Sequence, residues 1–139
     1  MAGYSNTPLL KKLGIKEHWR IKFINAPENY ESLLGTLPIL ANNPFETSQK
    51  DEAETYDFIH LFTNQLESFE QELIFLKKQL AKHGMIWISW YKKSSKKHTE
   101  LTEDLIRETA LAIGLVDVKV CAIDEDWSGL KLVFRLKDR

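Results

Sequence analysis

The sequence predicts a single α/β domain of the doubly wound kind, in which helices cover both faces of a mainly parallel sheet. Strand-like and helix-like segments alternate along most of the chain, as they do in this class. Residues 56–62 and 85–90 are nearly continuous apolar runs with the length of strands that are buried on both faces. Residues 116–122 and 130–136 alternate in polarity across a turn, which predicts a C-terminal antiparallel hairpin at one edge of the sheet.

Length and composition are those of one folded domain spanning residues 1–139. The fractions of 43% hydrophobic and 28% charged residues lie far from the composition of disordered chains. The formal net charge of −1 provides no overall basic field for nucleic acid or an anionic membrane. The chain has no apolar run of roughly 18 residues, no signal-peptide pattern at its start, and a single cysteine. We therefore expect a cytoplasmic protein that binds neither nucleic acid nor membrane.

The first third of the chain predicts two short helices and a strand. A proline followed by leucines and then a glycine predicts a helix over residues 8–13. Residues 19–26 alternate in polarity and end at a proline, which is typical of a strand that enters a turn. A second short helix is expected over 28–34. A short edge strand over 37–41 and a surface loop over 42–55 are expected to follow.

Two longer helices are predicted between the later strands. Apolar residues recur at spacings of three and four between residues 65 and 82, which places them on one helix face. Asn64 and Glu67 are a plausible N-terminal capping pair for this helix, and Gly84 is its expected end. The other helix is expected over 102–113.

The order of these elements resembles the second half of class I methyltransferases, which implies a three-layer, Rossmann-like fold but no activity. In methyl-donor and dinucleotide sites the loop after the first strand is rich in glycine, because the backbone must approach the ligand closely. Here residues 25–29 read Asn-Ala-Pro-Glu-Asn. Where an acid usually holds the ribose hydroxyls, the chain has Asn42 and Asn43. We therefore expect no cofactor.

Two polar segments supply the candidate ligand-binding residues. Residues 90–98 directly follow a central strand and contain four lysines with serines between them. Residues 124–131 include a tryptophan that a hairpin turn does not require. Together they supply six candidates for binding a small anion: Lys92, Lys93, Ser94, Trp127, Ser128 and Lys131. The alternatives are a solvated loop for the first segment and a tryptophan folded over the sheet edge for the second.

The histidines, serines and cysteine show no catalytic or metal-binding pattern. His60 lies inside a predicted buried strand, which is more typical of a hydrogen-bonded core residue than of a base. The other three histidines fall in separate loops without metal-ligand spacing, so we expect no metal. Cys121 has no local catalytic signature, and Ser89 lacks the glycines of a nucleophile elbow. Catalytic residues therefore stay unknown, and a domain without catalysis is favoured.

Six short sequence blocks spread over nearly the whole chain suggest a family. They are Gly3-Tyr-Ser-x-Thr-Pro-Leu9, Ala26-Pro-Glu-x-Tyr30, His60-Leu-Phe62, Trp87-x-Ser-Trp90 with Lys92-Lys93, Gly114-Leu-Val-Asp-Val-Lys-Val-Cys-Ala122 and Trp127-Ser-Gly-Leu-Lys131. Together they resemble a bacterial family known only as domain of unknown function 3052. The resemblance implies relatives but no activity, cofactor or substrate. The 42–55 segment looks longer and more polar than the family suggests.

Three functions remain open. The favoured one is a non-catalytic or uncharacterised domain on a methyltransferase-like scaffold, which binds a small anion or a protein partner. The first alternative is a divergent S-adenosylmethionine-dependent methyltransferase of small molecules, with its cofactor loop at 25–29. The second is a protein-interaction module that uses the basic segment.

Overall fold

The computed structural model describes residues 8–46 and 53–139, so part of the predicted 42–55 loop and most of the Gly3 to Leu9 block lie outside the described residues. The helices and strands are α1 (Leu9–Leu13), β1 (Ile21–Ile24), α2 (Tyr30–Leu34), β2 (Tyr56–Phe62), α3 (Phe69–Gln79), β3 (Leu80–Tyr91), α4 (Glu103–Ala112), β4 (Leu115–Ala122) and β5 (Trp127–Phe134). Short 3-10 turns lie at Lys93–Ser95 and Leu136–Asp138.

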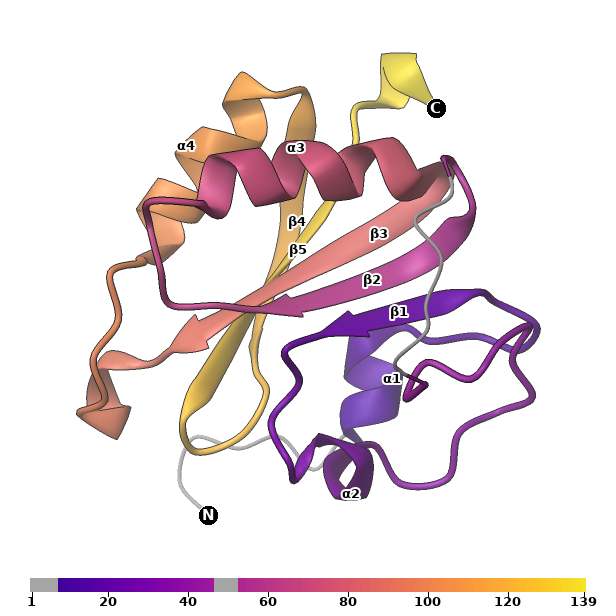
Figure 1. Cartoon of the computed structure of the whole chain (residues 1–139), viewed down its shortest axis with the longest axis horizontal. Helices are drawn as coiled ribbons and strands as arrows, with labels where there is room; N and C mark the ends of the chain where they lie inside the picture. The colour runs from indigo at the N-terminus through magenta and orange to yellow at the C-terminus, as the bar shows by residue number, and fades with distance from the viewer. Residues whose placement is uncertain (1–7, 47–52) are drawn as a thin grey trace.

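The strands form one five-stranded sheet in the order β1-β2-β3-β5-β4 (Figure 1). Strands β1, β2 and β3 are parallel, and β5 is antiparallel to both of its neighbours. This arrangement confirms the predicted α/β class with a mainly parallel start and a C-terminal hairpin. The hairpin strand β5 inserts between β3 and β4, so β4 is one edge strand of the sheet and β1 is the other.

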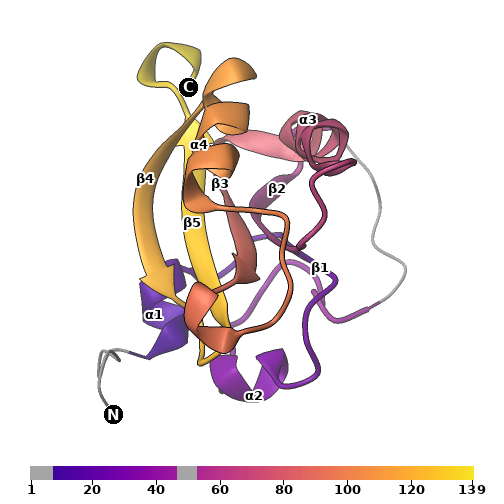
Figure 2. The ribbon, with the colours of Figure 1, turned by 90° about the vertical axis from the view of Figure 1, so that its left-hand side faces the viewer.

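Two apolar cores lie on opposite faces of the sheet. Ile59 and Leu61 of β2 belong to the cluster that includes α3 and α4, whereas Phe58 and Phe62 belong to the cluster that includes α1 and α2. Successive side chains of a strand point to opposite faces, so a continuous apolar run needs a cover on both. Figure 2 shows α3 and α4 together and α1 and α2 apart from them, which gives the predicted three layers.

Three polar side chains are buried together in the second core. The Tyr30 hydroxyl lies 2.5 Å from His60 Nδ1, and His60 Nε2 lies 2.7 Å from Ser89 Oγ. None of the three has measurable exposure. Burial lowers the pKa of His60 to about 3, so the ring is neutral at physiological pH. His60 is therefore a hydrogen-bonded core residue, as predicted.

Helix α3 is shorter than predicted at both ends. Asn64 does not cap it; its side-chain oxygen instead accepts a hydrogen bond of 2.8 Å from the backbone N–H of Tyr91. Gly84, the predicted end of the helix, lies within β3. A Cβ at Gly84 would lie 2.9 Å from the carbonyl oxygen of Asp57, so close strand packing explains this glycine.

The predicted edge strand over 37–41 is wrong. The segment lies beside the residues that lead into β1. Isolated backbone hydrogen bonds join the two, such as the one of 2.9 Å from the Ala41 N–H to the Trp19 carbonyl. The Asn42 side chain then bonds both the N–H and the carbonyl of Ile21, at 2.8 Å each. A side-chain amide, rather than another strand, therefore occupies part of the free edge of β1.

Candidate functional site

The candidate site is the edge of the sheet where β1, β2 and β3 end and the β4–β5 hairpin turns (Figure 1). Open α/β sheets bind their ligands outside the carboxyl ends of the strands. Four segments meet at this edge: the loops after β1, β2 and β3, and the turn over residues 123–126.

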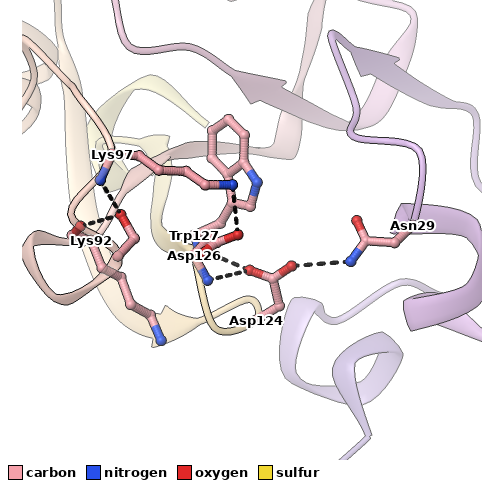
Figure 3. Close-up of polar contacts among 7 residues, drawn as sticks. Asn29, Lys92, Lys97, Asp124, Asp126 and Trp127 are labelled. Carbon is pink, nitrogen blue, oxygen red and sulfur yellow. Dashed lines mark hydrogen bonds and ion pairs between the residues drawn. The ribbon is translucent and has the colours of Figure 1, made fainter.

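Asp124 organises the hairpin turn and joins it to the loop after β1 (Figure 3). Its Oδ1 accepts hydrogen bonds from the backbone N–H groups of Asp126 and Trp127, at 2.8 and 2.9 Å. Its Oδ2 accepts a hydrogen bond of 3.2 Å from the Asn29 side chain. This pattern, typical of aspartate in turns, closes the turn before residue 127.

Asp126 joins the same turn to the loop after β3. Its carbonyl accepts a hydrogen bond of 2.8 Å from the backbone N–H of Lys92. Its carboxylate accepts one of 2.9 Å from Lys97 Nζ (Figure 3). The bond to Asp126 raises the pKa of Lys97. Lys97 Nζ also lies 5.4 Å from the centre of the Tyr91 ring. The turn thus positions both neighbouring loops.

The turn is shorter than the gap between the predicted strands over 116–122 and 130–136, because β5 already begins at Trp127. In the β3–β5 ladder, Trp127 pairs with Tyr91, and Ser128 pairs with Trp90. As neighbours on one strand, Trp127 and Ser128 point to opposite faces. Gly129 lies inside the strand, where a Cβ would be 2.9 Å from Cδ1 of Ile123.

On the α4 face, four of the six predicted residues line one hollow of about 820 Å³: Lys92, Lys93, Ser94 and Ser128. We call it the lysine hollow. The rest of its lining is Trp90, Tyr91, Thr99, Leu101, Thr102, Glu103 and Asp104. Pairing of β5 with β3 brings Ser128 to the residues that follow β3, although the two segments are far apart in sequence.

The first turn of α4 supplies two carboxylates to the lysine hollow, and both are already paired. Arg107 forms an ion pair with Glu103 and another of 2.9 Å with Asp104. Arg107 also bonds Asp117 of β4 at 2.9 Å, and this bond lowers the pKa of Asp117. One guanidinium charge is shared among three carboxylates, so it offsets only part of the negative charge beside the two lysines.

A second hollow, of about 490 Å³, opens at the ends of β1 and β2. Its aromatic wall is formed by Trp127, whose ring centre lies 4.4 Å from that of Tyr91 and 5.1 Å from that of Phe62. We call it the aromatic hollow. The rest of its lining is Asn25, Pro27, Thr63, Asn64, Gln65, Ser68 and Glu72. Glu72 was not among the residues predicted from sequence, because nothing in a helix pattern indicates which loop ends face the first turn of the helix.

The loop after β1 turns without glycine because Asn25 adopts the left-handed conformation, with φ of 58°. Among residues with a side chain, asparagine adopts this conformation most readily. The backbone can therefore turn at the end of β1, although it lacks the glycine-rich sequence of dinucleotide sites.

Lys131 lines neither of these two hollows. It sits in the middle of β5, opposite Trp87 on one side and Lys119 on the other. Its pKa is lowered by burial first, and then by the positive charges of Lys119 and Lys16. Trp127 does not line the lysine hollow either; it lines the aromatic hollow instead.

Among residues 8–46 and 53–139, no group of three or more His, Cys, Asp or Glu is placed to hold a metal ion. The half-buried thiol of Cys121 is free, and burial raises its pKa, which disfavours the reactive thiolate. Within the same described residues, no helix has the length and apolar character needed to cross a membrane.

Methyltransferases are among the solved structures that resemble this fold. A SAM-dependent methyltransferase from Aquifex aeolicus matches with a TM-score of 0.62 and 14% identity, over 91% of this chain and 88% of that one. A complex of the Haloferax volcanii Trm112 methyltransferase activator with a proposed methyltransferase matches with a TM-score of 0.64 and 10% identity, over 91% and 86%. At these identities the likeness shows the fold alone, and it confirms the methyltransferase-like architecture.

A search of curated proteins finds no match to this sequence. Residues 37–136 match a family described as "Protein of unknown function (DUF3052)". The match excludes the blocks at Gly3 and Ala26 but includes the lysine segment and the whole hairpin. It covers more than half of the sequence, and the chain belongs to the DUF3052 family.

Proposed function

We propose that this protein is a small-ligand-binding domain without catalysis, and that its ligand is an anion held in the lysine hollow. One observation carries the proposal: Lys92, Lys93, Ser94 and Ser128, selected from two separate sequence segments, line the same hollow. The hollow also lies at the carboxyl end of a parallel strand, where this architecture places its ligands.

The chemistry of the lining supports a phosphate or carboxylate ligand. Lysine ammonium groups and serine hydroxyls donate hydrogen bonds to anionic oxygens, and such charge-assisted bonds are about twice as strong as neutral ones. Trp90 and Leu101 are buried at this hollow and give it an apolar floor. Arg107 engages the acids Glu103 and Asp104, which reduces their repulsion of an anion.

Lys93→Ala is expected to weaken anion binding by about tenfold or more, because it removes a charge-assisted bond of roughly 1.5–3 kcal/mol. The measurement is a thermal-shift series with inorganic phosphate and small phosphorylated or carboxylated metabolites, followed by calorimetric titration of whichever stabilises the protein. Lys96→Ala is the matched control, since Lys96 is exposed in the same loop but does not line the hollow. Equal losses in the two variants would show a diffuse surface charge and contradict the proposal.

A divergent S-adenosylmethionine-dependent methyltransferase is the second candidate. The left-handed turn at Asn25 favours it, because the turn leaves the loop after β1 open toward the aromatic hollow. S-adenosylmethionine and S-adenosylhomocysteine therefore belong in the same thermal-shift series. Under the proposed function neither raises the melting temperature, whereas clear stabilisation by either would make the methyltransferase the better candidate.

A protein partner remains a separate prediction. One solved structure with this fold contains a methyltransferase activator, which makes a partner reasonable to test. Light scattering and crosslinking of the purified protein with candidate partners would show it.

A further inference from the structure

We propose that the aromatic hollow is a second binding site, which takes an organic ammonium ion. This site lies beyond the ends of β1 and β2 and is lined by Trp127, whereas the lysine hollow follows β3 and is lined by Ser128, whose side chain points to the opposite face of the sheet from that of Trp127. It is independent of the proposed anion site, and neither needs the other to be correct.

Aromatic rings form the first part of the argument. Trp127 and Tyr91 are only partly buried, so ring surface of both is available where they line the hollow. Phe62 lies behind them and packs edge-on against Trp127, with an interplanar angle of 89°. The faces of aromatic rings carry negative potential and attract ammonium groups, and tryptophan attracts them most strongly.

The charge of the lining is the second part. The lining contains one ionisable carboxylate, Glu72, and no lysine, arginine or histidine. Within the described part of the chain, no side chain or backbone group bonds this carboxylate, and burial raises its pKa. A carboxylate in such a place gains most from a cation that enters beside it.

Neighbouring groups do not favour an anion here. Lys97 is close to Tyr91, but its charge is paired with Asp126 at 2.9 Å. The positive end of α3 lies near Ser68, and it is offset by two acidic side chains in the first turn, Glu70 and Glu72. The other lining groups are neutral amides and hydroxyls, which can accept hydrogen bonds from a ligand.

The test is calorimetric titration of the whole chain with choline and with 3,3-dimethylbutan-1-ol, which has the same shape without the charge. Choline is expected to bind at least about tenfold more tightly than the alcohol, because ring and carboxylate attraction depend on the charge. Trp127→Ala is expected to weaken choline binding by about tenfold or more.

Glu72→Gln keeps the size and shape of the side chain, so it tests the charge even if Trp127→Ala fails to fold. It is expected to weaken choline binding by about fivefold or more. Glu70→Gln is the matched control, because Glu70 is an exposed residue of the same helical turn outside the lining. Lys93→Ala should leave choline binding unchanged, which separates this site from the anion site.

Three results would overturn the proposal: equal binding of the alcohol, equal effects of Glu72→Gln and Glu70→Gln, or no choline binding at all. A sulfonium ion offers the same chemistry as an ammonium ion. S-adenosylmethionine is therefore titrated in parallel, and its binding in the absence of choline binding would also overturn the ammonium site and favour the methyltransferase.

Discussion

Trp87→Ala is expected to lower the free energy of unfolding by about 3–5 kcal/mol, which is a large part of the stability of a domain this size. The Trp87 ring is fully buried in the core beneath α1 and α2. Its Nε1 also donates a hydrogen bond of 3.0 Å to the carbonyl of Leu13, at the end of α1. The substitution therefore leaves both a cavity and an unpaired carbonyl.

Urea denaturation followed by circular dichroism measures this loss. Trp19→Ala is the matched control, because Trp19 is only partly buried at the edge of the same core. We expect it to cost at most about 1.5 kcal/mol. Trp87→Phe fills most of the space but cannot donate the hydrogen bond, so it separates packing from the bond to Leu13. Similar losses for Trp87→Ala and Trp19→Ala would contradict the assigned core.

The sequence predicted those parts of the fold in which local pattern and tertiary packing demand the same residues. Strand β2 was predicted over residues 56–62 and forms over Tyr56–Phe62, because a strand buried on both faces must be apolar throughout. The structure of residues 37–41, where the predicted edge strand does not form, could not be predicted in this way. There the Asn42 side chain, next to the segment, bonds the backbone of Ile21, which lies 21 residues earlier in the chain, and a local pattern cannot reveal such bonds.

The hairpin shows why a turn can be predicted while its length is not. Asp124 bonds two backbone N–H groups and closes the turn early, so Trp127 and Ser128 are strand residues. Once β5 is known to begin at Trp127, alternation alone separates Trp127 from Ser128. Without that boundary, the sequence could group both with Lys131, which the structure places elsewhere on the strand.

The lysine hollow and the aromatic hollow share one lining residue, and the same hairpin turn positions the loops around both. Tyr91 is the last residue of β3 and lines both of them. The turn residues Asp124 and Asp126 hold the loops on either side of it. A ligand in either hollow therefore contacts loops that the same turn positions, and variants of Asp124 are expected to affect both sites.

The free energy of unfolding is expected to fall by about 3 kcal/mol as the pH is lowered from 7.5 to 4.5, because of His60. In the unfolded chain a histidine binds a proton near pH 6.5, whereas in the folded protein burial lowers the pKa of His60 to about 3. Between these values the unfolded state binds more protons, so acid favours unfolding. The stability is fully present above about pH 6.5 and is lost as the pH falls toward 3.

Urea denaturation at pH values from 4.5 to 7.5 measures this slope, and two histidine variants identify its source. His60→Gln is expected to be less stable at pH 7.5 but to lose most of the slope, since glutamine does not titrate. His18→Gln should keep the slope, because the His18 side chain is 73% exposed. Asp117 also loses stabilisation in acid, since Arg107 lowers its pKa below the ordinary aspartate value, and this contribution is the same in both histidine variants. An unchanged slope in His60→Gln would contradict the assignment of a neutral, buried imidazole bonded between Tyr30 and Ser89.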